Sequence, residues 1–97
     1  MAGQLEDRVA VITGAGEGIG RGIASAFVKE GAKVVIAEID AGLGNAAVSE
    51  LGKNVIFVET DVSVKEDNER MIAAAVDQWG TLDILVNNAW GGGVISR

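Results

Sequence analysis

The 97-residue sequence contains no histidine, no tyrosine, no cysteine and no proline. Histidine is the commonest general base of enzymes and tyrosine is a frequent general acid, so their absence leaves carboxylates, lysines and hydroxyls for proton transfer. Without cysteine, disulfides and thiolate metal sites are excluded, and we expect no metal centre. The lack of cysteine also fits a reducing compartment, so we expect a cytoplasmic protein.

Long apolar runs and excess positive charge are absent as well. No apolar run reaches the roughly 18 residues of a membrane-spanning helix, and residues 1–8 lack the apolar stretch of a signal peptide. The formal net charge is −6, which argues against nucleic acid or an anionic membrane as a partner. With 48% hydrophobic residues, the composition is typical of one small folded domain with a buried core.

The stretch Thr13–Gly20 (T-G-A-G-E-G-I-G) follows a continuous apolar run, Val9–Ile12. A strand that enters a glycine-rich bend before a helix forms a cradle for a diphosphate. Glycine lets the backbone approach the ligand, and the helix N-terminus offers free N–H groups. The spacing of Gly14, Gly18 and Gly20 differs from G-x-G-x-x-G, and the Gly-Lys-Ser/Thr of a P-loop is missing. The alternative is a tight turn whose small residues only let strand and helix pack.

The hydrophobic pattern predicts four strands separated by three helices. The strands are continuous apolar runs, typical of strands covered on both faces, and their short connections imply right-handed crossovers in one parallel sheet. We therefore expect an α/β fold: a Rossmann-like doubly wound parallel sheet truncated after four strands, β-α-β-α-β-α-β with strand order 3-2-1-4. Residues 1–97 would form a single partial domain, with a loose tail over residues 90–97. The expected strands are Arg8–Thr13, Lys33–Glu38, Asn54–Glu59 and Leu82–Val86, and the expected helices are Gly18–Glu30, Ala41–Leu51 and Ser63–Trp79.

Spacing within the helices predicts their buried faces. Ile19, Ile23 and Phe27 recur at steps of four and predict the inner stripe of the first helix. Ser63 and Glu66 form an S-x-x-E capping box at the start of the third helix. The residues expected to line the inner face of that helix are Ile72, Ala75, Val76 and Trp79.

Capping signals mark the helix ends. Gly31 and Gly80 stand where a left-handed glycine would terminate the first and third helices. Asp40 precedes the second helix as a cap, and the alternative is that it contacts the ribose of a bound nucleotide. Gly42 and Gly44 weaken the first turn of that helix, because each glycine costs about 1 kcal/mol relative to alanine.

Polar side chains follow the other three strands at the sheet edge where the glycine loop begins. Glu38 ends the second strand about twenty residues after the loop, where an acidic side chain accepts hydrogen bonds from the ribose hydroxyls of adenosine. Asp61 and Val62 follow the third strand, and the run 87–89 (Asn-Asn-Ala) follows the fourth. Ligands of open α/β folds bind at this edge, so we expect Asp61 to bond the adenine amino group and Val62 to pack on its ring. The alternative for Glu38 is a solvated charge at the end of a strand, and the alternative for Asp61 is a loop aspartate that precedes the next helix. The asparagine side chains could instead form hydrogen bonds with the loop backbone.

The charges near the loop predict which dinucleotide binds. Glu38 would repel a 2′-phosphate, and Glu17 adds a second negative charge within the loop. Residues 39–44 contain no arginine or lysine. We therefore predict NAD rather than NADP as cofactor.

Taken together, Thr13–Gly20, Asp61–Val62 and Asn87–Ala89 resemble the N-terminal motifs of the short-chain dehydrogenase/reductase family. They follow the family's order and spacing over nearly the whole chain. The resemblance implies a structural role for Asn87, and Trp90 stands where the family usually has glycine. It implies ten cofactor-binding residues: Gly14, Gly16, Glu17, Gly18 and Ile19 at the pyrophosphate, Glu38 at the adenosine ribose, Asp61 and Val62 at the adenine, and Asn88 and Ala89 on the nicotinamide side.

The family's chemistry uses a tyrosine, a lysine four residues later and a serine, so no catalytic residue can be assigned in a chain without tyrosine. We expect the cofactor-binding half of an NAD-dependent oxidoreductase, a truncated product or a fragment, inactive as a dehydrogenase alone. Its family transfers hydride between nicotinamide and an alcohol or carbonyl carbon. One alternative is a non-catalytic nucleotide-binding or assembly module whose exposed fourth strand pairs with another chain. A methyltransferase-like fold is less favoured because of Thr13 and the glycine spacing.

Overall fold

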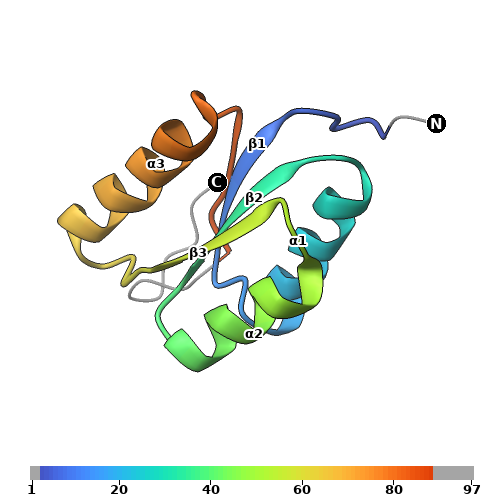
Figure 1. Ribbon diagram of the computed structural model, residues 1–97. Helices are drawn as coiled ribbons and strands as arrows, with labels where there is room; N and C mark the ends of the chain where they lie inside the picture. Colours follow the sequence, from blue (N-terminus) through green and yellow to red (C-terminus); the bar gives the residue numbers. More distant parts are fainter. Residues whose placement is uncertain (1–2, 89–97) are drawn as a thin grey trace.

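The computed structural model describes residues 3–88 and shows a four-stranded parallel sheet of order β3-β2-β1-β4 (Figure 1). The predicted order of elements and the predicted sheet are confirmed. The expected strands started one residue early for β1 and β3 and two for β4. The expected loose tail lies outside the described residues. The strands are β1 (Val9–Thr13), β2 (Lys33–Glu38), β3 (Val55–Glu59) and β4 (Ile84–Val86), and the helices are α1 (Gly18–Lys29), α2 (Ala41–Leu51) and α3 (Lys65–Trp79).

Helices α1 and α2 cover one face of the sheet and α3 covers the other (Figure 1). Successive side chains of a strand point to opposite faces. Accordingly, Ile12 of β1 packs in the cluster under α1 and α2, whereas Val11 packs with Met71 and Ala75 under α3. All five residues of β1 are buried, which explains why its first four residues are all apolar instead of alternating with polar ones.

Helix α1 buries a different stripe from the one expected. Ile19 is 78% exposed, so its predicted place on the inner face is wrong. Gly20 and Ala24 are the buried residues of the helix, while Ile23 and Phe27 pack partly against the core. The helix begins close against the end of β1, where only small residues fit, and this places Ile19 outward beside the glycine loop.

The predicted capping box of α3 is also wrong. The N-cap of α3 is Val64, whose side chain makes no capping bond. The Ser63 hydroxyl donates instead to Asp61 Oδ1 at 2.6 Å, and the Ser63 N–H donates to the same oxygen. Because Asp61 offers a stronger acceptor two residues earlier, the serine closes an Asx turn and leaves the helix uncapped by a side chain.

The inner face of α3 is formed by Met71 and Ala75, whereas Ile72 and Val76 are 38% and 44% exposed. The prediction for these last two residues is therefore wrong. Arg70 donates to the backbone oxygen of Glu59, which joins α3 to the end of β3. Helix α3 carries two neighbouring apolar stripes, one formed by Met71 and Ala75 and the other by Ile72 and Val76. The sheet buries the first of them.

The other predicted helix ends are confirmed. Gly31 and Gly80 have φ of 95° and 85°, the left-handed region expected at these ends. Asp40 caps α2 by accepting from the Leu43 N–H at 3.0 Å. Gly44 has a packing reason that the sequence did not reveal: a Cβ there would collide with the ring of Phe57 in β3. The glycine that weakens the helix lets it approach the sheet.

Strand β4 is the shortest strand and pairs with β1 alone among the described residues. Its middle residue, Leu85, lies in register with Val11 and is 40% exposed. Within the described part of the chain, no helix is long and apolar enough to cross a membrane.

Candidate functional site

The carboxyl ends of the strands bring three of the predicted stretches to one pocket. The glycine loop follows β1, Glu38 ends β2, and Asp61 and Val62 follow β3. This is the edge at which open α/β sheets bind ligands. The residues that line the pocket are Gly14, Ala37, Glu38, Ile39, Thr60, Asp61 and Val62.

The glycine loop presents an open helix N-terminus. Gly14 and Gly18 both have φ of 63°, a conformation that side-chain-bearing residues rarely adopt. Gly14 donates its N–H to the Ala37 oxygen at 2.8 Å, which continues the pairing of β1 with β2. Glu17 is the N-cap of α1, but its side chain makes no capping bond. The first N–H groups of α1 are therefore free of a side-chain cap and suited to an anion.

Gly16, at the centre of the loop, is held at both its backbone polar groups. Its N–H donates to Glu38 Oε1 at 2.9 Å, and its oxygen accepts from the Arg21 guanidinium at 2.9 Å. A Cβ at this position would lie 2.7 Å from both Glu38 Oε1 and the Cβ of Leu43. Only glycine fits here without displacing Glu38.

The Glu38 carboxylate is buried, with the residue 7% exposed. Its second oxygen accepts from the N–H of Asp40 at 3.1 Å, so each oxygen has one backbone donor. A carboxylate has about four acceptor positions. Glu38 therefore retains capacity to accept hydrogen bonds from the hydroxyls of a ligand in the pocket.

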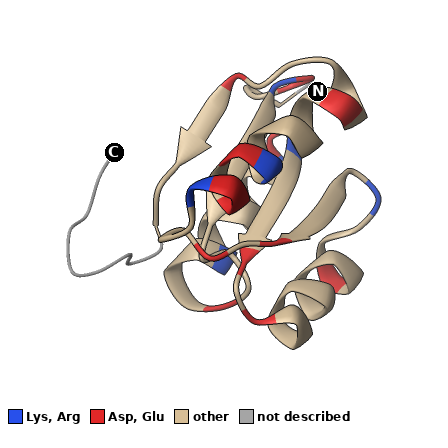
Figure 2. Cartoon of the chain, turned by 90° about the vertical axis from the view of Figure 1, so that its left-hand side faces the viewer, with Lys and Arg blue, Asp and Glu red and all other residues tan. Residues whose placement is uncertain are grey.

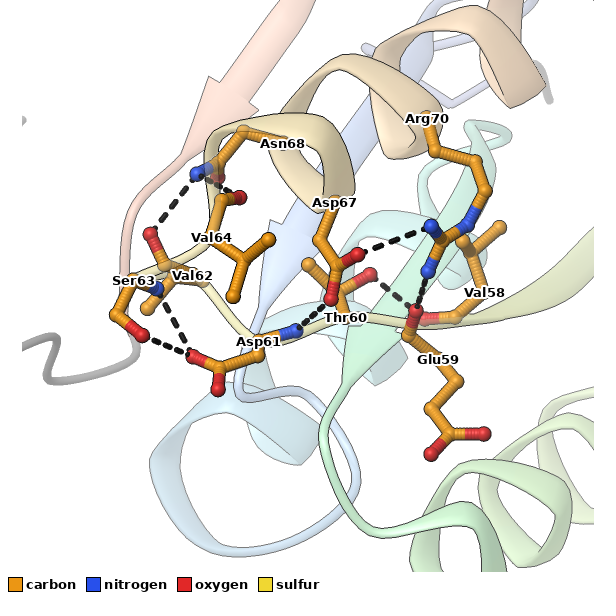
Figure 3. A network of polar contacts seen from close by, with 10 residues as sticks. All are labelled: Val58, Glu59, Thr60, Asp61, Val62, Ser63, Val64, Asp67, Asn68 and Arg70. Atoms are coloured by element: carbon orange, nitrogen blue, oxygen red, sulfur yellow. Dashed lines mark hydrogen bonds and ion pairs between the residues drawn. The ribbon is translucent and has the colours of Figure 1, made fainter.

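Asp61 is held through its backbone N–H and its carboxylate (Figure 3). Its N–H donates to Asp67 Oδ2 at 2.9 Å, and Arg70 holds Asp67 through a 2.9 Å contact. The side-chain and backbone hydrogen bonds from Ser63 lower the pKa of the Asp61 carboxyl from its usual value. These bonds stabilise the charged form of the carboxyl, which is an acceptor at the pocket. The neighbouring Val62 is held as well, because its oxygen accepts from Asn68.

The end of β4 is tied to the glycine loop by Asn88. Its N–H donates to Thr13 Oγ1 at 2.8 Å, and its side chain donates to the Gly14 oxygen at 3.4 Å. Asn88, the residue predicted to contact the cofactor, therefore also makes a structural tie of the kind expected of Asn87. A Cβ on Gly20 would collide with the Gly14 oxygen and lie 2.6 Å from Asn88 Nδ2. Ala89 and Trp90 lie outside the described residues.

Acidic segments lie on the loops around this edge (Figure 2). Sequence reasoning found Glu17, Glu38 and Asp61 there but missed Arg21. Arg21 stands three residues after Gly18, and its guanidinium reaches back to the loop while pairing with Glu50 of α2. Among residues 3–88, no group of three or more acidic residues is placed to hold a metal ion.

Comparison with known proteins identifies the family. The family model for short chain dehydrogenases matches residues 8–95. The chain therefore belongs to the short-chain dehydrogenase/reductase family. It is a partial, N-terminal representative, because it spans about a third of the length of the curated relatives it matches.

Three similar proteins illustrate the match. A sorbitol dehydrogenase of Cereibacter sphaeroides is 42% identical over 86 residues, which are 89% of this chain and 34% of that protein. The sex determination protein tasselseed-2 of Zea mays is 45% identical over 98 residues, covering 100% of this chain and 28% of the relative. A crystal structure of 3-ketoacyl-(acyl-carrier-protein) reductase from Brucella melitensis, complexed with NADH, superposes with a TM-score of 0.86. That structure is 44% identical and is matched over 89% of this chain and 35% of its own.

Proposed function

We propose that this chain is the NAD-binding half of an oxidoreductase that transfers hydride between nicotinamide and an alcohol or carbonyl carbon. The observation that carries the proposal is the buried Glu38 carboxylate, which joins the glycine loop and lines the pocket. Family membership supports the reaction class, and the related reductase was crystallised with NADH. With family membership established, we set aside the methyltransferase-like alternative.

The residues of this edge fit a dinucleotide. Gly16 and Gly20 leave no room for a Cβ, and the first turn of α1 lacks a side-chain cap, so backbone N–H groups are open to a diphosphate. Glu38 accepts from hydroxyls, and Asp61 accepts from an exocyclic amine. When bound, the nicotinamide would supply the hydride acceptor or donor. The residues assigned to binding are Gly14, Gly16, Glu17, Gly18 and Ile19 at the diphosphate, Glu38 at the ribose, Asp61 and Val62 at the adenine, and Asn88 and Ala89 on the nicotinamide side.

NAD is preferred over NADP in this proposal. A 2′-phosphate would carry its negative charge next to Glu38, whose two oxygens are held in place by backbone donors. Moving that carboxylate away would leave the N–H groups of Gly16 and Asp40 without their partner. Two like unit charges about 4 Å apart repel each other by about 4 kcal/mol at an effective dielectric constant of about 20. We therefore expect NADPH to bind more weakly than NADH.

The sequence has no tyrosine, so the tyrosine that the family's chemistry uses is not among these 97 residues. The chain alone is then expected to bind NADH without oxidising or reducing an alcohol or carbonyl substrate. Titration with NADH and NADPH, followed by fluorescence, tests binding and preference. Failure to bind either dinucleotide would refute the proposal, and turnover of a ketone by the purified chain would refute catalytic incompleteness.

A second candidate is a non-catalytic module that assembles through the edge of β4. It is favoured by Leu85, an exposed leucine on a strand with one described partner. Native mass spectrometry distinguishes the two, since an assembly module would associate without dinucleotide. The cytoplasmic location expected from the sequence stays a prediction, and cell fractionation would test it.

A further inference from the structure

Arg21 connects three parts of the structure around the glycine loop. One guanidinium nitrogen donates to the Gly16 oxygen at 2.9 Å, and another forms an ion pair with Glu50 of α2. The arginine side chain is 22% exposed, and its buried Nε has no hydrogen-bond partner among the described residues. A long cationic side chain is thus folded back under the loop instead of extending into solvent.

This contact is the counterpart of the one made by Glu38. Glu38 holds the N–H of Gly16 and Arg21 holds its oxygen, so two side chains of opposite charge fix the two peptide groups that flank this glycine. Both bonds are charge-assisted, the stronger class of protein hydrogen bond. Glu50 in turn orients the guanidinium, whose planar fork binds two acceptors at once.

Holding Gly16 in place affects ligand affinity because the loop is rich in glycine. Glycine loses more conformational freedom on ordering than any other residue. A ligand that binds the N–H groups of a mobile loop must supply that ordering free energy, whereas a loop held in advance binds more tightly. Ion pairing with Glu50 also places a cation beside a loop whose own charged residue is Glu17.

We propose that Arg21 is a positioning residue that holds Gly16 and so preorganises the glycine loop for a diphosphate. Arg21 acts through the loop backbone and not by contact with the nicotinamide. The inference rests on the proposed dinucleotide function and assigns to this arginine a role that the loop motif does not contain.

The test compares Arg21→Ala with the wild-type 97-residue chain in titrations with NADH, ADP and adenosine. We expect NADH and ADP to bind on the order of tenfold more weakly, the size of one lost charge-assisted hydrogen bond. Adenosine, which lacks the diphosphate, should bind within about twofold of wild type. Amide hydrogen exchange in the ligand-free chain should accelerate over residues 14–18 and stay unchanged in β2 and β3.

Three further variants make the result specific. Arg8→Ala removes a cation that pairs with Asp83 near the start of β1. It therefore makes the same charge change as Arg21→Ala at a position away from the loop. Glu50→Gln removes the ion pair but leaves the bond from Arg21 to Gly16, and should weaken NADH less than Arg21→Ala does. Arg21→Lys keeps the charge and can reach one acceptor, so we expect partial rescue.

The outcomes separate the two proposals. If wild type binds NADH and Arg21→Ala binds it equally well, Arg21 has no positioning role. A parallel loss of adenosine and NADH binding also contradicts the inference, because it indicates general destabilisation. Should Arg21→Ala fail to fold, equal binding by Glu50→Gln, Arg21→Lys and wild type would overturn it. If wild type binds neither dinucleotide, the proposed function itself fails.

Discussion

The Glu38 carboxylate accepts the N–H of Gly16 at 2.9 Å, so the residue that ends β2 also shapes the loop that follows β1. The two residues are 22 positions apart in the chain. An acidic side chain at this position is expected to hold ribose hydroxyls, and here it also holds the loop that we propose binds the diphosphate. In the proposed function, ribose recognition and loop order are therefore coupled through one carboxylate.

Replacing Glu38 by alanine should lower both stability and NADH affinity. The variant leaves the buried N–H of Gly16 without its acceptor, a loss of about 1–3 kcal/mol for a buried donor, and it also removes the partner of the part-buried Asp40 N–H. Urea denaturation would give the free energy of unfolding, and NADH titration the affinity. The matched control is Glu59→Ala, since Glu59 lies in register with Glu38 on β3 but is exposed. Its free energy of unfolding should change by less than about 0.5 kcal/mol, and equal effects of both variants would contradict the assigned role.

Two glycines of α1 should respond oppositely to alanine. In Gly20→Ala the new Cβ meets the Gly14 oxygen, so the loop and the helix must separate and NADH binding should fall by an order of magnitude or more. Gly22 has open space around it, and Gly22→Ala should stabilise the chain by about 0.5–1 kcal/mol through helix propensity. Thermal unfolding and NADH titration of both variants provide the measurement. Equal binding by the two variants would show that the close approach at Gly20 is unnecessary.

The fold was predictable because its signals are local and agree with one another. Each strand is an apolar run, each connection is short, and Gly31 and Gly80 mark the helix ends. The errors arise where two apolar stripes compete on one helix, as with Met71 and Ile72. Sequence spacing alone does not show which stripe the sheet buries, since that depends on how the whole helix packs on the strands.

The sequence indicated which sheet edge carries the candidate site, but it did not reveal the hydrogen bonds that connect the residues there. Residue type and position relative to the strands located Glu38 and Asp61 correctly at one pocket. The hydrogen bond from Arg21 to Gly16 was not predictable, because the sequence position of Arg21 is that of an ordinary helix residue. Only the structure shows that its side chain folds back onto the loop. Similarly, the tie from Asn88 to Thr13 joins residues 75 positions apart, a contact that no local pattern specifies.

Removing the Ser63 hydroxyl should raise the pKa of Asp61 toward its usual value. In the folded chain the Ser63 hydroxyl and N–H stabilise the ionised carboxylate and lower this pKa. The stability that these bonds contribute is present above the unfolded-state pKa and is lost as the pH falls through the lower folded-state pKa. NMR titration of the Asp61 carboxyl in Ser63→Ala and wild type would measure the shift. An unchanged pKa in Ser63→Ala would show that the backbone N–H alone, or another group, sustains it.

The edge of β4 should make the chain associate with itself. Leu85 is in register with Val11, which belongs to the cluster under α3, so the leucine lies on the α3 face. On α3 itself, Ile72 and Val76 are exposed as well. An apolar strand edge without a second partner is a template for pairing, and natural sheets often protect such edges with lysine.

Leu85→Lys should therefore shift the chain toward monomer, with sedimentation equilibrium over a concentration series as the measurement. The control is Ala46→Lys, which adds the same charge at an exposed position of α2, on the opposite face of the sheet. Added charge alone would disperse both variants equally, whereas edge pairing predicts that only Leu85→Lys does so. A wild-type chain that sediments as a monomer at every concentration would show that the side chains on β4 and its neighbours already protect the edge. Association through β4 would then be excluded, and the nucleotide-binding function would stand independently of it, because none of the pocket residues lies on that strand.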